Sequence, residues 1–225
     1  MYGPDPAQNV QLAHAIAIAK RNNCPKSLVE DSIARGQGKS LKGASLENLT
    51  FEIMMPPGIA LMIEVETESK GRVIQHLNDM VKRRGGTTTG AKFLFTRAGR
   101  VVFGPGDSGL SSIDDIMDDA IEAGAEDLET DADGNMVVWT EPTQTMQVCQ
   151  GLASKLKLKV LSSDIVWTAN EDTKAELQMS NHVKELENLL VALREDPDIQ
   201  AIYSNASQGS LTDEEWARIE EHLDL

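Results

Sequence analysis

The segment that decides the fold is DPDIQAIYSN, residues 196–205. Asp196 and Pro197 end a helical pattern, and residues 199–204 then form a short apolar run typical of a strand. No segment next to it in the sequence offers a partner strand, so it must join a sheet formed earlier in the chain. We predict that it returns to a sheet built from residues 49–104, which makes residues 110–170 an insertion.

The earlier sheet is predicted from a change of period after Leu49. FEIMM at residues 51–55 and IALMIEVET at residues 59–67 indicate two strands joined by a PPG turn. A helix follows from about residue 70 to residue 84, where two glycines end it.

The next stretch, KFLFTRAGRVVFG at residues 92–104, predicts a hairpin that turns near Ala98 and Gly99. Beyond it, residues 110–170 carry the patterns of a helix, a hairpin around Asp133 and Gly134, a second helix and a strand. This order predicts a small antiparallel sheet with helices on one face.

Both ends of the chain read as helical. Residues 5–22 and 25–36 predict two helices whose apolar stripes need a third partner, either upstream or from the next domain. A long helix is predicted from about Lys174 to Arg194, and a short acidic helix carrying Trp216 follows from Leu211.

The predicted fold class is therefore α+β, and the domain division is as follows. We predict an N-terminal helical domain at residues 1–45 and a discontinuous central α+β domain at residues 46–108 and 171–210. An inserted α+β domain occupies residues 109–170, and an acidic C-terminal helix occupies residues 211–225.

The charge is distributed unevenly along the chain. The formal net charge is −15, but residues 1–105 contain 14 Lys and Arg against 9 Asp and Glu, a net +5, and residues 106–225 contain 7 against 27, a net −20. Such asymmetry suggests one face for a polyanion and another that is kept away from it. The alternative is that the basic residues are only a solvated face.

Several classes of chemistry find no support in the sequence. The two cysteines, Cys24 and Cys149, are far apart and outside any CxxC or Cys/His cluster, which favours buried or half-buried thiols over zinc or a disulfide. GGTTTGAK at residues 85–92 resembles a phosphate loop, but its Lys does not follow the last Gly directly and it follows a helix. DADGN at residues 131–135 lacks the spacing of a calcium loop. We predict no enzyme activity, no metal site, no cofactor, no membrane span and a monomer.

The basic residues are the feature with a clear mechanism, because Lys and Arg can neutralise phosphates and release counterions. Phe93, Phe95 and Phe103 alternate along predicted strands, and we expect them in the core and not on a base-stacking platform. Recognition of backbone and shape is therefore expected. The predicted nucleic-acid-binding residues are Lys20, Arg21, Lys26, Arg35, Arg72, Lys82, Arg83, Arg84 and Lys92.

A series of motifs from Asp5 to Asn205 resembles the YebC family in order and spacing. They are DPAQN, LAHAIAIAKRNNCPKS, IARG, VETESKGR, KRRGG, FLFTRAGRVVF, AIEAGAEDLE and LLVALREDPDIQAIYSN. The resemblance implies three domains, with a ferredoxin-like domain inserted into the central one.

The resemblance also implies a function in gene expression. The family divides between factors that help ribosomes through difficult sequences such as proline runs, including mitochondrial translational activators of cytochrome oxidase synthesis, and bacterial transcriptional regulators. We favour a translational activator that associates with the ribosome or its RNA, with messenger RNA or DNA as further candidate partners. The alternatives are a DNA-binding transcriptional regulator, for which no helix-turn-helix reading helix is evident, and an enzyme, for which no catalytic constellation is evident.

Two departures from the family pattern affect these expectations. FEIMMPPG at residues 51–58 replaces the family's YEGYGPGG, so that Ile53, Met55 and Pro57 stand where glycines are usual. The chain also opens at MYGPDP, without the basic GHSKW segment, and we expect a first domain that is truncated. The divergent glycine loop leads us to predict a mitochondrial location, with the bacterial cytoplasm as the alternative.

Overall fold

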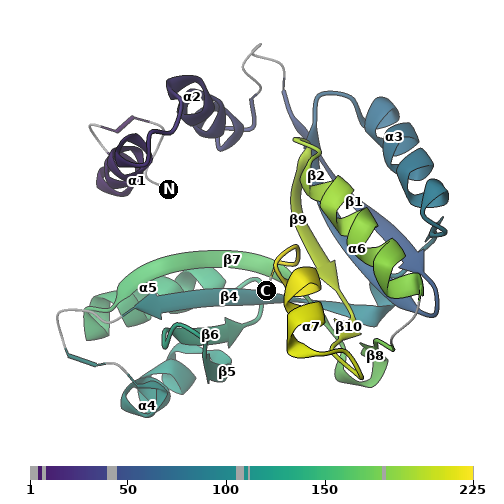
Figure 1. The fold of residues 1–225 in the computed structure, drawn as a ribbon. Helices are drawn as coiled ribbons and strands as arrows, with labels where there is room; N and C mark the ends of the chain where they lie inside the picture. The colour runs from purple at the N-terminus through teal and green to yellow at the C-terminus, as the bar shows by residue number, and fades with distance from the viewer. Residues whose placement is uncertain are drawn as a thin grey trace.

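The structure is a computed structural model that describes residues 5–6, 9–39, 45–104, 109–110, 112–178 and 181–224. It is a mixed α+β fold in which helices pack against antiparallel sheets (Figure 1). Two four-stranded sheets, each with two helices on one face, form most of it, and two N-terminal helices lie beside them.

The first sheet contains the returning strand. Its order is β3-β1-β2-β9, built from β1 (Glu47–Met55), β2 (Ile59–Thr67), β3 (Thr87–Thr88) and β9 (Ile199–Ser204). Strand β9 runs antiparallel to β2, with Ile202 opposite Ile63. The prediction that residues 199–204 return to the sheet of residues 49–104 is confirmed.

One face of this sheet carries the larger core of the molecule. Helices α3 (Lys70–Arg83) and α6 (Asn181–Arg194) cover it, and they bury Leu77 and Leu189 against Ile53 and Ile63. Burying each of these side chains stabilises the fold by roughly 1.5–3 kcal/mol.

The second sheet has the order β5-β6-β4-β7, built from β4 (Phe95–Gly104), β5 (Ala125–Thr130), β6 (Met136–Thr140) and β7 (Lys159–Ala169). Helices α4 (Ile113–Ala123) and α5 (Thr145–Leu156) pack on one of its faces. Along the chain the elements follow one another as β-α-β-β-α-β, and all neighbouring strands are antiparallel.

The predicted hairpin at residues 92–104 is wrong. Strand β4 runs straight through Ala98 and Gly99, pairs with β6 and β7, and belongs to the second sheet. Gly99 is there for space and not for a turn, since a Cβ atom at this position would lie 1.9 Å from Oγ1 of Thr145 at the start of α5. The change from the first sheet to the second therefore occurs at Phe95, and the return follows Ala169.

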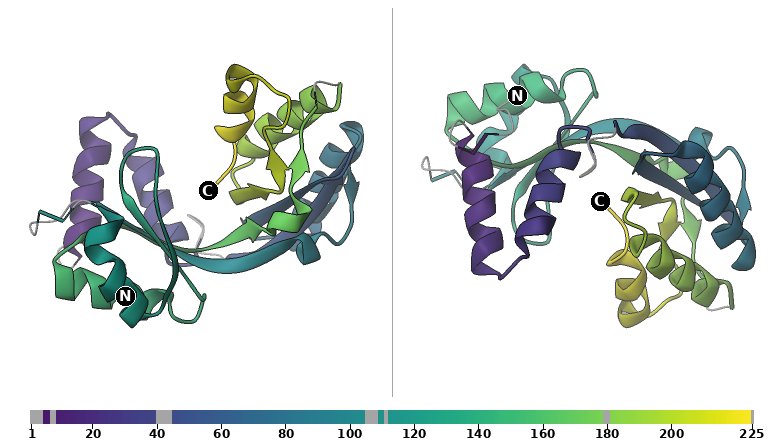
Figure 2. Two further views of the ribbon diagram at one scale, coloured as in Figure 1. Left: turned by 90° about the horizontal axis from the view of Figure 1, so that it is seen from below. Right: turned by 90° about the horizontal axis from the view of Figure 1, so that it is seen from above.

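The far ends of β4 and β7 connect the two sheets. Phe95 and Trp167 pack with Ala60, Met62 and Tyr203 on the face of the first sheet that α3 and α6 leave uncovered. Figure 2 shows β4 and β7 as a long curved ribbon that belongs to one sheet at one end and lies against the other sheet at the opposite end.

The N-terminal helices are α1 (Val10–Arg21) and α2 (Lys26–Arg35). The helix predicted from residue 5 includes residues 7 and 8, which lie outside the described part of the chain. A groove of about 1060 Å³ lies between the two helices, and Met146 and Gln150 of α5 contribute to its wall. Helix α5 thus lines one side of this groove, and Ile18 and Leu28 remain 44% and 54% exposed.

The C-terminal part departs from prediction at one point. The helix predicted from Lys174 begins only at Asn181, because Ala175–Glu176 form strand β8, which pairs with β10 (Ala206–Ser207). The short helices η1 (Lys92–Leu94) and η2 (Glu171–Thr173) precede β4 and β8. The predicted acidic helix is present as α7 (Asp213–Glu220), which Thr212 and Glu215 begin with a capping box.

Asn205, which follows β9 and is 2% exposed, fixes this arrangement. Its Oδ1 accepts from the amide of Ala60 at 2.7 Å, and its Nδ2 donates to the carbonyl of Thr173 at 2.7 Å. Asn205→Ala would leave these buried groups unsatisfied, so we expect a loss of roughly 1–3 kcal/mol in the free energy of unfolding.

Chemical denaturation of the variant and the parent measures this loss. Asn48→Ala, at an exposed strand position, is the control and should change stability by less than about 0.5 kcal/mol. Equal stability of the Asn205 and Asn48 variants would contradict the assigned role.

Candidate functional site

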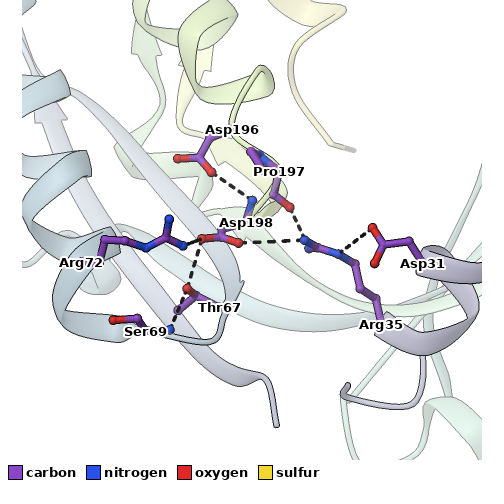
Figure 3. A network of polar contacts seen from close by, with 8 residues as sticks. All are labelled: Asp31, Arg35, Thr67, Ser69, Arg72, Asp196, Pro197 and Asp198. Atoms are coloured by element: carbon purple, nitrogen blue, oxygen red, sulfur yellow. Dashed lines mark hydrogen bonds and ion pairs between the residues drawn. The ribbon is translucent and has the colours of Figure 1, made fainter. Parts of the chain in front are cut away.

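Two of the predicted phosphate-binding residues meet at one carboxylate. Arg72 in α3 places Nη2 at 3.0 Å from Oδ2 of Asp198, and Arg35 in α2 places Nη2 at 3.9 Å from Oδ1 of the same residue (Figure 3). Thr67 at the end of β2 donates its hydroxyl to Asp198 at 3.1 Å. The side chain of Asp198 is only 13% exposed, so its charge is mainly satisfied within the protein.

Arg35 is held by more than this ion pair. Its Nη1 donates to the carbonyl of Pro197 at 2.7 Å, and its Nε lies 3.6 Å from the carboxylate of Asp31, one turn earlier in α2. The charge of Arg35 is therefore used to attach α2 to the segment between α6 and β9.

Two other residues that we predicted to bind phosphate, Lys26 and Arg84, also have partners within the protein. Lys26 lies 3.4 Å from Glu30 on the same helix. Arg84 donates from Nε to the carbonyl of Asn188 in α6 at 3.1 Å and from Nη1 to that of Met80 at 3.2 Å. Arg84 is half-buried and links α3 to α6, so its guanidinium is engaged within the protein.

Lys92 lies over an aromatic ring that the sequence analysis did not single out. Its Nζ is 5.4 Å from the ring centroid of Trp167, and Cζ of Arg97 is 5.2 Å from the same ring. Trp167 donates to Glu64 at 3.2 Å and is nearly buried. The arrangement is a cation–π cluster at the junction of the two sheets.

The remaining four predicted residues are Lys20 and Arg21 at the end of α1 and Lys82 and Arg83 at the end of α3. All four are exposed, and none has an ion-pair or side-chain hydrogen-bond partner among the described residues. Figure 1 places α1 and α3 on opposite sides of the molecule, so the nine residues do not form one continuous basic face.

A cleft of about 690 Å³ lies beside α3, but its charge is mixed. Its walls include Arg72, Arg83 and Arg84 and also four acids, namely Asp79, Glu195, Asp196 and Asp198. The acids offset the arginines, so the interior of this cleft does not attract a phosphate strongly. Arg83 forms part of this wall, whereas Lys82, at the same exposed end of α3, does not line the cleft.

The chain after α3 runs along the outer edge of β1 and displays polar groups. Thr87 and Thr88 pair with Met54 and Ile53 of β1. The carboxylate of Glu52 accepts from the amides of Ala91 and Lys92, so this acid is occupied. Residues 80–104 contain no Asp or Glu. Residues 82–93, which comprise the last two residues of α3 and the chain that follows it as far as Phe93, are called the edge strip below.

The edge strip ends in an aromatic side chain that is in the solvent. Phe93 is 75% exposed, whereas Phe95 and Phe103 are buried. The expectation that all three lie in the core is therefore wrong for Phe93, because the short helix η1 interrupts strand alternation at that residue.

The other motifs have local roles. Asp131 accepts from the amides of Asp133 and Asn135 within the predicted hairpin turn, and the hydrogen bond from the Asn135 side chain is the main cause that lowers its pKa. Cys24 is half-buried and Cys149 is buried, as predicted, and burial raises the pKa of the Cys149 thiol.

Within the described ranges, no group of three or more His, Cys, Asp and Glu could hold a metal ion, and no helix there has the length and apolar character needed to cross a bilayer. The statement about metal ligands does not cover His14, one of the four histidines of the chain, because its side chain lies outside the described residues.

Comparison with known proteins identifies the family. Residues 46–206 match the family model described as TACO1/YebC second and third domain. The chain belongs to the TACO1/YebC family. Its residues 46–206 contain the edge strip, Asp198 and both four-stranded sheets, so the features described above lie mainly within the part that the family model matches.

Relatives of this family are named as regulators. Proteins called probable transcriptional regulatory protein are 32% identical over 206 residues in Rubrobacter xylanophilus and 34% identical over 206 residues in Clostridioides difficile. Both alignments cover 90% of this chain, and they cover 79% and 83% of those relatives.

A solved structure shares the fold. The crystal structure of a conserved hypothetical protein from Aquifex aeolicus is similar with a TM-score of 0.64 and 26% identity, over 92% of this chain and 83% of that one. These relatives are bacterial proteins named as regulators or as hypothetical proteins, and none of their names supports the predicted mitochondrial location.

The contacts of Asp198 lead to a prediction about helix α2. Asp198→Ala should free Arg35 and Arg72, lower the free energy of unfolding by about 1–3 kcal/mol and speed amide hydrogen exchange in α2. Hydrogen exchange resolved by peptide measures the local effect. Glu187→Ala, which removes a partly exposed pair between α6 and Arg218 of α7, is the control and should leave α2 unchanged. Unaltered exchange in α2 of the Asp198 variant would show that the contact does not hold the helix.

Proposed function

We propose that this chain regulates gene expression by binding a nucleic acid through phosphate contacts at the C-terminal end of α3 and along the edge strip. The observation that carries the proposal is the pair Lys82 and Arg83, which are exposed, unpaired among the described residues and followed by a segment free of acids. Cations in such surroundings release counterions on meeting phosphates. By contrast, Arg35, Arg72 and Arg84 serve internal contacts, and we assign them structural roles.

Transcription is the level of regulation that the names of the bacterial relatives favour. For that role we propose duplex DNA as the ligand. Translation, with the ribosome or its RNA as the partner, is the second candidate. The exposed ring of Phe93 at the end of the edge strip favours it, because unpaired bases are common in folded RNA and absent from duplex DNA. The names of the relatives support a regulatory protein and not an enzyme.

The proposed organisation has three domains. The α1–α2 pair is the first, the first sheet with α3, α6 and α7 is the second, and the β-α-β-β-α-β unit of residues 95–169 is the third and is ferredoxin-like. Sheet membership supports boundaries at Phe95 and Ala169, in place of those predicted at residues 108 and 170. The bacterial relatives favour the bacterial cytoplasm as its location over the mitochondrion.

The first experiment compares ligands. Binding of duplex DNA, folded ribosomal RNA and intact ribosomes is measured for the parent protein at several salt concentrations. Tighter binding to duplex DNA supports regulation of transcription, and tighter binding to RNA or ribosomes supports regulation of translation. If no ligand binds at low salt, the proposed function is wrong.

The second experiment tests the site. Lys82→Glu with Arg83→Glu should weaken binding and should reduce the slope of log affinity against log salt by about 0.7–0.9 for each lost phosphate contact. Both side chains are exposed, so the melting temperature should stay close to that of the parent. Arg84 is left unchanged because of its contacts with α6.

The matched control reverses two charges in the acidic half. Asp118 and Glu126 are exposed and have no ion-pair partner among the described residues, whereas Asp119 pairs with Lys155 at 2.7 Å and is unsuitable. Asp118→Lys with Glu126→Lys should leave binding intact or strengthen it. Binding by the Lys82/Arg83 variant equal to that of the parent across the salt series would remove the end of α3 from the site.

A further inference from the structure

We propose that Phe93 is a base-stacking residue, and that the edge strip therefore takes an unpaired stretch of nucleic acid in preference to a duplex. This inference rests on the proposed binding of nucleic acid, and it names unpaired RNA or DNA as the ligand class, which favours the second candidate, translation, over a duplex DNA ligand. It departs from the sequence analysis, which expected recognition of backbone and shape without stacking.

The first argument is that the ring is displayed from a fixed backbone. The carbonyl of Phe93 accepts from Nδ2 of Asn170 at 3.1 Å. The carbonyl of the next residue, Leu94, accepts from the Asn170 amide at 2.9 Å and from the Thr173 hydroxyl at 3.0 Å. On the other side, Glu52 holds the amides of Ala91 and Lys92. Backbone anchored on both sides of an exposed ring costs little entropy when the ring meets a partner.

The second argument is that the ring has no structural use. Phe93 is the most exposed of the large apolar side chains in the described part of the chain, at 75%, and it belongs to none of the three apolar clusters there. Its neighbour Leu94 instead packs against the cluster of Trp167 and Tyr203. The fold thus partly buries Leu94 of η1 and leaves the adjacent aromatic ring in the solvent.

The third argument concerns what lies along the strip. From Phe93 the chain leads back through the exposed Lys92, Gly90 and Thr89 to the paired strand β3, and from there to Arg83 and Lys82 at the end of α3. Cations and hydroxyls on one edge suit a phosphate backbone, and an aromatic ring at its end suits a base. A protein partner anchored on one ring would need a larger apolar surround than this polar edge offers.

The charge near the ring is nearly balanced. In η2, Glu171 forms an ion pair with Lys174 at 2.7 Å, which leaves Asp172 as the acid of that helix without a partner among the described residues. Stacking on a base does not need a positive potential at the ring itself, because every base presents a π face. The phosphate contacts are supplied further along the edge strip.

The preference for unpaired nucleic acid follows from geometry. In a duplex the faces of the bases are covered by their neighbours, so an aromatic ring can stack only on a base that is unstacked or at an end. Single-stranded RNA and single-stranded DNA share this chemistry, and separate measurements with each distinguish the two.

The experiment uses the full chain with Phe93→Ala, Phe93→Leu and Phe93→Trp. Affinity is measured for a labelled single-stranded RNA, a single-stranded DNA of the same sequence, and the duplex of each. Phe93→Ala and Phe93→Leu should weaken single-strand binding by about 5- to 150-fold, the range of one aromatic stacking contact, and leave duplex binding unchanged. Phe93→Trp should retain the affinity, and the added indole emission should be quenched on binding.

The leucine variant is the critical control, because it keeps an apolar side chain and removes the π face. All three variants should melt at the temperature of the parent, since the ring is exposed. If leucine binds as well as phenylalanine, the contact is not base stacking and the inference fails.

The remaining outcomes separate this inference from the proposed function. If Phe93→Ala binds single strands like the parent while the Lys82/Arg83 variant does not, stacking is wrong and phosphate binding stands. If the parent binds no nucleic acid, both are wrong. If Phe93→Ala binds nucleic acid normally but alters self-association in sedimentation, the ring belongs to a protein contact and the inference is overturned.

Discussion

The pairing of β9 with β2 is the constraint on which the rest of the structure depends. It joins segments that lie far apart in the sequence. At one end of the pair Thr67 hydrogen-bonds to Asp198, and these two residues are 131 positions apart. Closing such a loop costs entropy, and the cost grows only slowly with length, so an inserted unit is tolerated if its two ends leave the sheet close together. They do, because Phe95 lies opposite Ala169 in the β4–β7 pair. The insertion therefore enters and leaves as one antiparallel ribbon.

Each end of the β2–β9 pair holds a different part of the molecule. At one end Asn205 hydrogen-bonds to Ala60, next to the β1–β2 turn, and to the carbonyl of Thr173. At the other end Asp198 accepts a hydrogen bond from Thr67 and pairs with Arg72 and Arg35, and so attaches both α3 and α2 to the start of β9 (Figure 3). The chain has a net charge of −15, so its many acids compete with a ligand for the arginines. Arg35 and Arg72, whose guanidinium groups pair with Asp198, are therefore less available to a phosphate. Charge counts along the sequence overstate the binding surface for that reason, and local partners decide which cations remain.

The sequence predicted the elements well and their partners unevenly. The return of residues 199–204 could be predicted, because an unpaired strand needs a sheet, and that return also brings Asp198 beside Thr67 and the first turn of α3. The path of β4 could not be predicted, because a glycine can indicate either a turn or a place where another group packs closely against the backbone. Only the position of Thr145 shows that the second case applies at Gly99. Phe93 was misplaced because two-residue alternation was extended through a short helix. The link that Arg84 makes between α3 and α6 could not be predicted, because its partners are backbone carbonyls, which carry no sequence signal.

The three residues that stand where the resemblance leads us to expect glycines, Ile53, Met55 and Pro57, lie in β1 and in the turn that follows it. Ile53 and Met55 are buried in the core under α3 and α6, so two of the three replacements change packing and not the accessible surface. Gly86 fits this packing, since a Cβ there would lie 2.5 Å from Sδ of Met55. Of the three, only Pro57 lies in the exposed turn. A loss of backbone access to a ligand can therefore arise at that turn alone, while the adjoining edge of β1, with the edge strip beside it, keeps its exposed hydroxyls and cations.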